Sequence, residues 1–544
     1  LALRASWPPA AAGSNDSSGA CGDLAALVAC RRLGSVSWKR ARVRRHCLPA
    51  LESARLGDSG VRCYIGSMRI WLVAAWLALA VGCDGGGELD ADGGLVDASR
   101  SDDAGETDAG LGDAGLGDAG LADAAVADGG ESDAGAPDAG PGRVDALAAR
   151  LSDPSASAAA LDALIHEVAW AEGWPVRDGA SWLFATRWDD APPEVSLVSD
   201  VNDWSPARGA ASRAASGVHY WVRLDGASFD VPAAGAKYKW RGAPDVFRAP
   251  PEATAYGYDA FGEHGYVAPP TDVRWRERFP AFESASLEAP RAFRALLPAR
   301  FTPGDAARVL QLNYGQNVFH PHAPFRGWRV DEAVSAAGYE DVLVLAIDNA
   351  PVRMSAYTHV PDRIGGGPTG GRADDYLDLV EREALPFFRA RYGVAAAGDG
   401  LVIGGSSLGG LVSLYAAQSR PTLSGCVIAM SPTLGWGAFD PAADGADALV
   451  RRWSTRAGPA LYLDSGGGGT CGDPDGDGVA EDSDDRDNYC VTRQLRDRLE
   501  TLGYAHGVDL FHWYEAGAGH DEAAWAARIS RGLAACASAG WAAP

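Results

Sequence analysis

The sequence predicts an α/β protein in which helices cover both faces of a mostly parallel sheet, preceded by a small β-sandwich. Three observations support this prediction. Buried parallel strands read as uninterrupted apolar runs. Such runs lie at 308–313, 341–347, 400–403, 425–430, 459–463 and 508–514, and several are separated by helical segments. A glycine-rich turn follows the run that ends at residue 403. Shorter strands separated by turn residues precede residue 270.

The amino-terminal part of the chain predicts export. Residues 1–67 show no sustained periodicity, and we expect them to be untranslated or disordered, with translation beginning at Met68. Residues 68–83 combine a basic residue with an apolar core too short to span a bilayer, as in a secretory signal. Residues 80–83 resemble a bacterial lipoprotein cleavage box, which implies a lipid anchor on Cys83. Ordinary secretion, with cleavage nearby, is the alternative.

A segment rich in Asp, Ala and Gly follows at 84–146. It holds too few large apolar residues to close a core, so we expect a disordered tether, extended by its mutually repelling carboxylates. This segment supplies much of the formal net charge of −24. A strongly acidic chain without a basic cluster argues against nucleic acid as a partner.

The strands of the predicted β-sandwich lie within residues 147–270, at 181–186, 194–198, 217–224 and 236–241, after a helical pattern at 147–168. Residues 198–206 resemble the strand and turn of the immunoglobulin-like domains that precede some esterases and glycogen-branching enzymes. Four tryptophans could pack in the core or form a platform for sugar stacking: Trp182, Trp204, Trp221 and Trp240.

The turn after residue 403 has the pattern Gly-x-Ser-x-Gly, which places Ser407 as a nucleophile between Gly405 and Gly409. In a nucleophile elbow this spacing is required because neighbouring side chains would collide in the tight strand-to-helix turn. Ser406 fails the pattern, since Leu408 occupies its second glycine position. The elbow predicts an α/β-hydrolase domain over residues 271–540.

A serine nucleophile needs a histidine as base and an acid that orients it, and in this fold they follow in the order acid, then histidine. His520 lies in a glycine-rich loop after the last predicted strand, where the base belongs. Several aspartates lie between the serine and this histidine. We favour Asp487, just before a predicted helix, with Asp464 as the alternative.

An acidic insertion at 466–490 predicts a structural calcium site, because its alternating carboxylates match the ligand spacing of a calcium loop. The candidate ligands are Asp473, Asp475, Asp477, Glu481 and Asp484. A solvated acidic loop is the alternative. Cys471 and Cys490 bracket the insertion and suit a disulfide in an exported protein. Cys426 and Cys536 are either a second pair or buried thiols.

Residues 291–533 resemble the putative esterase family, which includes enterochelin and feruloyl esterases. Residues 314–319 are similar to its Asp-Gly-Gln-Asn-x-Phe turn, with tyrosine in place of aspartate. Residues 346–353 and 355–358 are similar to its pocket segments, and residues 519–525 to its histidine loop. The resemblance implies an oxyanion hole formed by the backbone amides of Leu408 and Gln316. It also implies pocket roles for Tyr314, Asn317, Arg353 and Tyr357.

Together these features predict an exported, surface-tethered serine carboxylic-ester hydrolase that needs no catalytic cofactor. The resemblance implies small-molecule or glycan esters, such as siderophores or feruloyl and acetyl sugars, as substrates. Two alternatives stay open: an acyltransferase, and a calcium-dependent surface binding protein on an inactive esterase scaffold. The sequence does not indicate an oligomeric state.

Overall fold

The computed structural model describes residues 24–32, 35–43 and 142–543, except for 227–231, 243–245, 365–366, 457 and 485. The chain divides into two units, Leu1–Ala98 and Ser99–Pro544. The export signal, Cys83 and the tether up to residue 141 lie outside the described residues. Within the part of the chain that is described, every helix is too short or too polar to cross a membrane.

The first unit contains one antiparallel hairpin, formed by strands β1 (Leu24–Arg32) and β2 (Ser35–Val43). The expectation that residues 1–67 are untranslated or disordered stays a prediction. Two strands joined by a short connection are marginally stable by themselves.

Two helices open the second unit. Helix α2 (Arg143–Ser152) begins inside the segment assigned to the tether, because its buried residues Val144, Leu147 and Leu151 repeat at helical spacing. Helix α3 (Ala158–Ala171) starts at Ser157, whose hydroxyl accepts a hydrogen bond from the amide of Ala160 at 3.2 Å. The single helical pattern expected at 147–168 is therefore two helices.

The predicted sandwich is a two-layered β-structure. One layer is a four-stranded sheet of β3 (Val176–Asp178), β4 (Ser181–Arg187), β7 (His219–Asp225) and β6 (Ser212–Arg213). The other layer contains β5 (Val195–Ser199) and β8 (Lys237–Gly242), and one apolar cluster fills the space between the layers. The second layer belongs to the central sheet described below, so the expectation of an immunoglobulin-like domain is not confirmed.

The four tryptophans of this region do not form one platform. Trp240 is fully buried in the core between the two layers. Trp182 packs against the same core, whereas Trp221 packs against the core under α2 and α3, on the other face of its sheet. Trp204 is 39% exposed and donates a hydrogen bond to Asp200.

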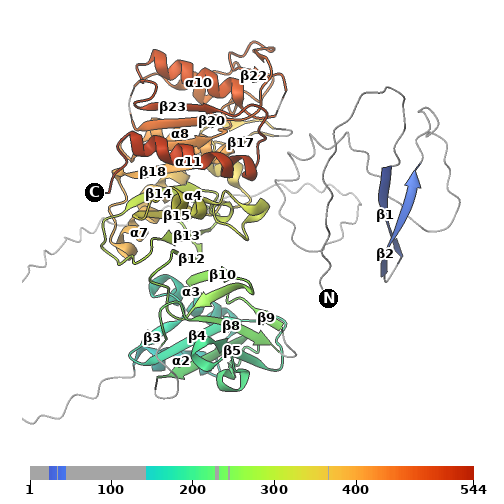
Figure 1. The fold of residues 1–544 in the computed structure, drawn as a ribbon, viewed down its shortest axis with the longest axis vertical. Coiled ribbons are helices and arrows are strands. Elements are labelled where there is room, and N and C mark those ends of the chain that lie inside the picture. Colours follow the sequence, from blue (N-terminus) through green and yellow to red (C-terminus); the bar gives the residue numbers. More distant parts are fainter. Residues whose placement is uncertain are drawn as a thin grey trace, which may run out of the picture. The chain divides into compact units, whose positions relative to one another are not determined.

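A 13-stranded sheet forms the centre of the second unit (Figure 1). Its strand order is β23-β20-β19-β18-β14-β15-β13-β12-β10-β11-β8-β5, and β9 also pairs with β8. The strands from β23 to β15 are parallel, and the remaining pairings are antiparallel. The bounds not given above are β9 (Val246–Arg248), β10 (Ala255–Asp259), β11 (Gly262–Tyr266), β12 (Trp275–Phe282), β13 (Arg291–Leu297), β14 (Arg308–Asn313), β15 (Val342–Ile347), β18 (Gly398–Ser406), β19 (Ser424–Met430), β20 (Ala460–Ser465) and β23 (Leu510–Tyr514).

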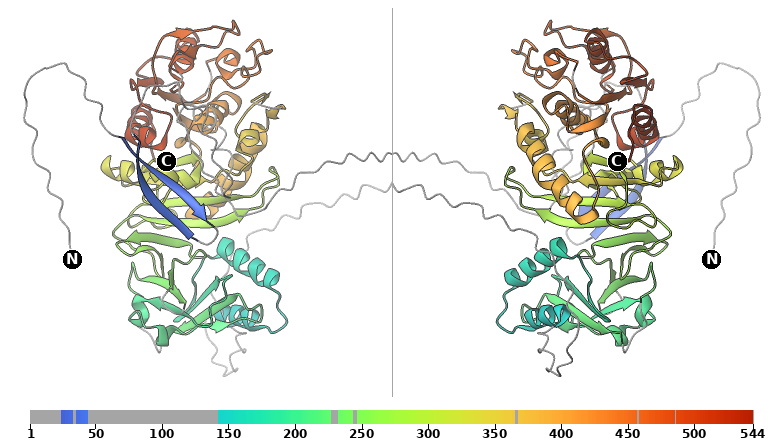
Figure 2. Two further views of the ribbon diagram at one scale, coloured as in Figure 1. Left: turned by 90° about the vertical axis from the view of Figure 1, so that its right-hand side faces the viewer. Right: turned by 90° about the vertical axis from the view of Figure 1, so that its left-hand side faces the viewer.

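Helices cover both faces of the parallel strands (Figure 2). Alternate strand residues point to opposite faces, so the sheet contributes to two separate apolar cores. One core lies under α4 (Val330–Ala336) and α11 (Glu522–Ser538). The other lies under α6 (Ala373–Asp378), η5 (Leu379–Ala384), α7 (Leu385–Tyr392), α8 (Ser407–Ser419), α9 (Leu449–Arg452) and α10 (Tyr489–Thr501). This architecture confirms the predicted α/β-hydrolase fold class.

The sheet continues across the predicted domain boundary between residues 270 and 271. Strand β10 pairs with β12, with Ala255 opposite Glu277. On one face the ring of Trp170 from α3 packs within 5.4 Å of Phe279, Phe293 and Phe387. The boundary stays a prediction, but the two predicted domains share backbone hydrogen bonds and an aromatic cluster.

Two disulfides join distant elements. Cys471 pairs with Cys490 across the acidic insertion, where β21 (Cys471–Gly472) pairs with β22 (Glu481–Asp482). Cys426 pairs with Cys536, which connects β19 to α11. The second bond decides between the two alternatives that the sequence left open for these cysteines.

Candidate active site

Ser407 lies where β18 passes into α8, in the left-handed conformation with φ +52°. This conformation is unfavourable for a non-glycine residue and is typical of functional sites. The flanking glycines make the turn possible. A methyl group on Gly405 would lie 2.4 Å from the backbone of Gly409, and one on Gly409 would lie 2.9 Å from the ring of Tyr314. The local sequence therefore produces the elbow geometry.

The structure brings Ser407, His520 and Asp487 into one hydrogen-bonded chain. His520 Nε2 lies 2.9 Å from Ser407 Oγ, and His520 Nδ1 lies 2.7 Å from Asp487 Oδ1. Ser407 is half-buried, the His520 side chain is 20% exposed and that of Asp487 is fully buried. The three residues follow three strands of the parallel part of the sheet, β18, β20 and β23, as expected for chemistry at the carboxyl edge of a parallel sheet.

Asp487 is held as a carboxylate. Burial alone would raise its pKa, but hydrogen bonds from His520, Ser431 and Gly466 outweigh burial and hold the pKa of Asp487 below its usual value. Ser431 Oγ donates to Asp487 Oδ2 at 2.6 Å, and the Gly466 amide donates to the same oxygen at 2.5 Å. An ionised acid can orient the imidazole and stabilise its protonated form.

Asp464, the alternative acid, contacts other groups. Its carboxylate lies 3.3 Å from Arg528 Nε and accepts a hydrogen bond from Tyr462 at 3.1 Å. Burial raises the pKa of Asp464 to about 6, although Arg528 opposes the shift. The geometry therefore favours Asp487 as the partner of His520.

The turn predicted to form half of the oxyanion hole is η3 (Gly315–Asn317), and it packs on the elbow through Tyr314. Tyr314 adopts a left-handed conformation, and its amide donates to the Tyr357 hydroxyl at 3.4 Å. The Gln316 side chain accepts a hydrogen bond from the amide of Asn349 at 3.0 Å, which fixes the turn. The second candidate donor is the amide of Leu408, in the first turn of α8.

The predicted pocket residues lie around this turn at different depths. Tyr357 is fully buried, so it supports the turn from behind. The Arg353 guanidinium lies over the Tyr314 ring, 5.8 Å from its centroid. Asn317 donates to Glu522 at 3.1 Å, and burial raises the pKa of Glu522, which lies close enough to His520 for their charges to interact. Arg353, Asn317 and Glu522 thus give the site charged and polar groups beside the triad.

Three further residues contact the triad and were not predicted. Thr433 Oγ1 lies 3.3 Å from Ser407 Oγ, and the Thr433 amide donates to the Ser407 carbonyl at 3.2 Å. Ser431 and Arg528 lie behind Asp487. A signal for Arg528 was present, since Arg528 and Ile529 follow Trp525 by three and four residues on the buried stripe of α11. A charge on such a stripe requires a buried partner.

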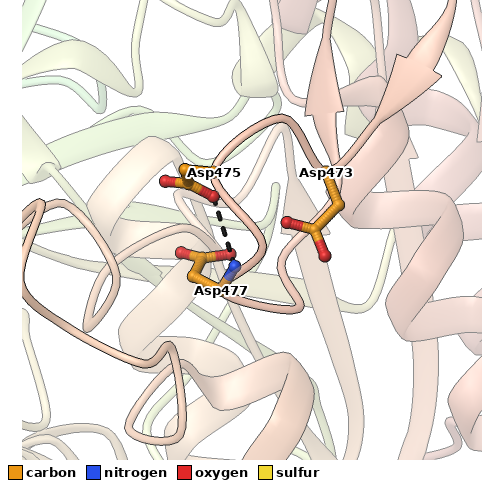
Figure 3. Close-up of side chains that lie close together, drawn as sticks. All are labelled: Asp473, Asp475 and Asp477. Carbon is orange, nitrogen blue, oxygen red and sulfur yellow. Dashed lines mark hydrogen bonds between the residues drawn. The ribbon is translucent and has the colours of Figure 1, made fainter.

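The acidic insertion brings three of its five candidate metal ligands together. Carboxylate oxygens of Asp473, Asp475 and Asp477 lie within 4.8 Å of one another (Figure 3). The other two candidates, Glu481 in β22 and Asp484, are not in this group. The three carboxylates also accept amide hydrogen bonds within the loop, such as that from Val479 to Asp477 at 2.7 Å. Oxygen ligands at this spacing suit a hard divalent cation.

Comparison with known proteins gives a family match for part of the chain. Residues 284–536 match the model of the family described as putative esterase. This segment is an esterase-family domain of the α/β-hydrolase type, which confirms the resemblance expected from its motifs. A curated relative, the siderophore triacetylfusarinine C esterase of Aspergillus fumigatus, is 40% identical over 74 residues, which make up 13% of this chain and 25% of that protein. The chain therefore matches about a quarter of the length of this relative.

Two solved structures illustrate the structural comparison. The enterobactin esterase of Shigella flexneri has 15% identity and a TM-score of 0.35, with 65% of this chain and 93% of that chain covered. A ferulic acid esterase has 17% identity and a TM-score of 0.36, with 49% of this chain and 99% of that chain covered. These scores are too low to carry an argument, so the family assignment depends on the sequence match.

The elbow geometry predicts the effect of adding one methyl group. Gly405→Ala places a Cβ atom 2.4 Å from the Gly409 backbone, and two backbone segments must separate to admit it. We expect loss of reaction between Ser407 and an active-site-directed fluorophosphonate. Ala417→Gly, a change of the same size at a buried position further along α8, should retain the reaction. Normal labelling of the Gly405 variant would contradict this account of the turn.

Proposed function

We propose that the α/β-hydrolase part of this chain, residues 271–540, is a serine carboxylic-ester hydrolase that acts through an acyl-enzyme. The observation that carries the proposal is the hydrogen-bonded chain from Ser407 through His520 to Asp487, with distances of 2.9 and 2.7 Å. It lies on an elbow with the required backbone strain. Membership of the esterase family supports the same reaction class.

In the acylation step, Ser407 Oγ attacks the ester carbonyl while His520 Nε2 accepts the hydroxyl proton. Asp487 stabilises the resulting imidazolium, because its carboxylate is buried and ionised. The amides of Leu408 and Gln316 are the proposed donors to the oxyanion, and the loss of one such donor typically raises the barrier by about 3 kcal/mol. Collapse of the tetrahedral intermediate transfers the proton from His520 to the alcohol, which leaves.

In the deacylation step, His520 removes a proton from water, which attacks the acyl carbonyl and releases the acid. A sugar hydroxyl in place of water would give acyl transfer, so the two activities share the same acyl-enzyme. The proposed substrates are small-molecule or glycan esters, including siderophores and feruloyl or acetyl sugars. The siderophore esterase activity of the fungal relative motivates the first class, and the motifs shared with feruloyl esterases motivate the second.

The proposal predicts covalent labelling of one serine. We expect the pure protein to react with a fluorophosphonate probe and to cleave short p-nitrophenyl esters, and Ser407→Ala to abolish both reactions.

Asp487→Asn should lower kcat by about 10⁴-fold, because the amide favours the wrong imidazole tautomer. A panel that includes a feruloyl sugar and a catecholate siderophore, with and without an acceptor sugar, distinguishes hydrolysis from transfer and identifies the acyl group.

The neighbouring serine provides a matched control. Ser406→Ala should still be labelled, because Ser406 is the buried N-cap residue of α8 and Leu408, not glycine, stands two residues after it. A wild-type protein that is neither labelled nor active on any ester of the panel would contradict the proposal. Calcium-dependent glycan binding that persists in Ser407→Ala would then favour the inactive binding scaffold.

We propose further that the acidic insertion binds structural calcium through Asp473, Asp475 and Asp477. The supporting observation is that three carboxylates lie close together. Burial, and then repulsion from the other two carboxylates, raises the pKa of Asp477, and a bound cation would relieve this repulsion. Calcium at about 100 times its dissociation constant should raise the free energy of unfolding by about 2.7 kcal/mol. Asp475→Asn should reduce this gain, whereas Asp497→Asn on the exposed side of α10 should not. A melting temperature that excess chelator leaves unchanged would exclude the site.

Export and a lipid anchor on Cys83 form a separate proposal, supported by the signal-like segment at 68–83. In a bacterial host, the wild-type chain should fractionate with membranes. Cys83→Ser should release it into a soluble exported fraction, because one lipid-modified residue is its only proposed anchor. Cytoplasmic recovery of the wild-type chain would refute export, and membrane association of Cys83→Ser would refute the anchor.

A further inference from the structure

A buried polar cluster lies directly behind Asp487, on the side away from Ser407. It consists of Ser431 at the end of β19, Asp464 on β20 and Arg528 on α11. The side chains of Arg528 and Asp464 have no exposed area, and Ser431 is fully buried. Burying a charge is costly without a partner, so the contacts of this cluster require an explanation.

The hydrogen bonds of Ser431 have only one consistent direction. Trp525 Nε1 lies 3.2 Å and Arg528 Nη2 lies 2.9 Å from Ser431 Oγ. An indole N–H and a guanidinium can only donate, so the hydroxyl accepts from both. Its single proton is therefore directed to Asp487 Oδ2 at 2.6 Å.

The backbone of Ser431 is also constrained. Its φ is +42°, a left-handed conformation that is rare for serine. Its amide donates to the Asp464 carbonyl at 2.9 Å, and its carbonyl accepts from Asn488 Nδ2 at 3.0 Å. Strained residues of this kind collect where geometry serves function. Ser407 on the neighbouring strand shares this feature.

Arg528 is placed between two carboxylates. Its Nε lies 3.3 Å from Asp464 Oδ2, and its Nη2 lies 3.9 Å from Asp487 Oδ2. Asp464 thus supplies a counter-charge for Arg528. Arg528 therefore does not need an ion pair with Asp487 that would compete with the hydrogen bond from His520. One guanidinium fixes the hydroxyl, and the second carboxylate balances the guanidinium.

We propose that Arg528 is a positioning residue, which fixes the Ser431 hydroxyl and through it holds Asp487 in the rotamer that faces His520, with Asp464 as its counter-ion. The inference rests on the proposed esterase function and deepens it. None of the three residues touches Ser407 or the site of the reacting carbonyl, so each acts through Asp487.

The ionisation of Asp464 gives the cluster a pH dependence. Its pKa of about 6 results from burial, opposed by Arg528. Below this pH, Asp464 is neutral and Arg528 keeps only Asp487 of its two carboxylate partners, which raises the net positive charge beside the Asp487–His520 pair. Among the described residues, Tyr462 on β20 faces Asp464, Glu522 at the start of α11 interacts electrostatically with His520, and Asp482 of the acidic insertion interacts with Asp487.

The kinetic test uses Arg528→Gln, Ser431→Ala and the double variant, with Arg531→Gln as the matched control. Arg531 lies on the exposed side of α11, over the Trp513 ring. We expect each single change to lower kcat about 10-fold with KM changed by less than about two-fold, since a displaced catalytic group costs turnover more than binding. The double variant should lose no more than either single variant, because Arg528 acts through Ser431. Additive losses, or an unchanged kcat in Arg528→Gln, would overturn the proposal.

A pH profile separates positioning from general destabilisation. In Asp464→Asn, Arg528 has lost one of its two carboxylate partners at every pH, and the added net positive charge opposes proton uptake by His520, the partner of Asp487. The acidic midpoint of kcat/KM should therefore move to lower pH, whereas a merely destabilised fold would lower activity without moving it. An unmoved midpoint would contradict the counter-ion role of Asp464.

A measurement independent of turnover distinguishes this inference from the proposed function. The proton on His520 Nδ1 should give a downfield NMR resonance through its hydrogen bond to Asp487, identified by its loss in His520→Ala. We expect this resonance to shift or broaden in Ser431→Ala and Arg528→Gln and to stay unchanged in Arg531→Gln. If it responds while no ester is cleaved, the positioning role stands and the esterase proposal falls. A resonance unaffected by both changes, in folded variants, would refute the positioning role.

Discussion

The hydrogen bond between Asp487 and His520 is the contact on which the arrangement of the site depends. It joins the loop after β20 to the loop after β23, whose strands are parallel neighbours ending at Ser465 and Tyr514. Backbone hydrogen bonds continue between the loops beyond the strand ends, from Gly467 to Ala518 and from Gly517 to Gly467, both at 2.8 Å. The long acidic insertion can therefore hold the Asp487 carboxylate in a fixed position, because backbone hydrogen bonds fix the start of the insertion beside the loop after β23.

The insertion carries exposed aspartates in one part and buries the ionised Asp487 in another. Its outer part carries exposed aspartates, and the Cys471–Cys490 disulfide closes it just beyond Asp487. Its inner part buries Asp487 among donors that keep the group ionised. Water solvates the charges of the exposed aspartates in the outer part. In the inner part, hydrogen bonds to Asp487 replace those that water would make.

The sequence predicts the parallel strands closely because their burial on both faces leaves a direct signal. The run at 308–313 coincides with β14, and the run at 425–430 lies within β19. The continuation of the sheet across residue 270 leaves no such signal. Strand β10 meets β12 through only a few paired residues, such as Tyr256 with Arg276, and half-buried strands read alike in a sandwich and in an extended sheet.

For the site, Ser407 and His520 could be predicted because each belongs to a local pattern. Asp487 required a choice among many aspartates, which the position of a predicted helix guided. The role of Ser431 and Arg528 could not be predicted, because it arises from contacts between residues far apart in sequence. Burial of an ion pair is a property of the packed structure, and a single sequence shows only the unusual arginine.

The family match begins at residue 284, whereas the sheet does not begin there. Strand β13 is bordered on one side by β15 and on the other by β12, which ends at residue 282. A fragment that begins at residue 284 would lack β12. The N–H and C=O groups of β13 on that side would then be unpaired and could form hydrogen bonds with another chain. The upstream strands therefore cover an edge that the family domain alone would expose.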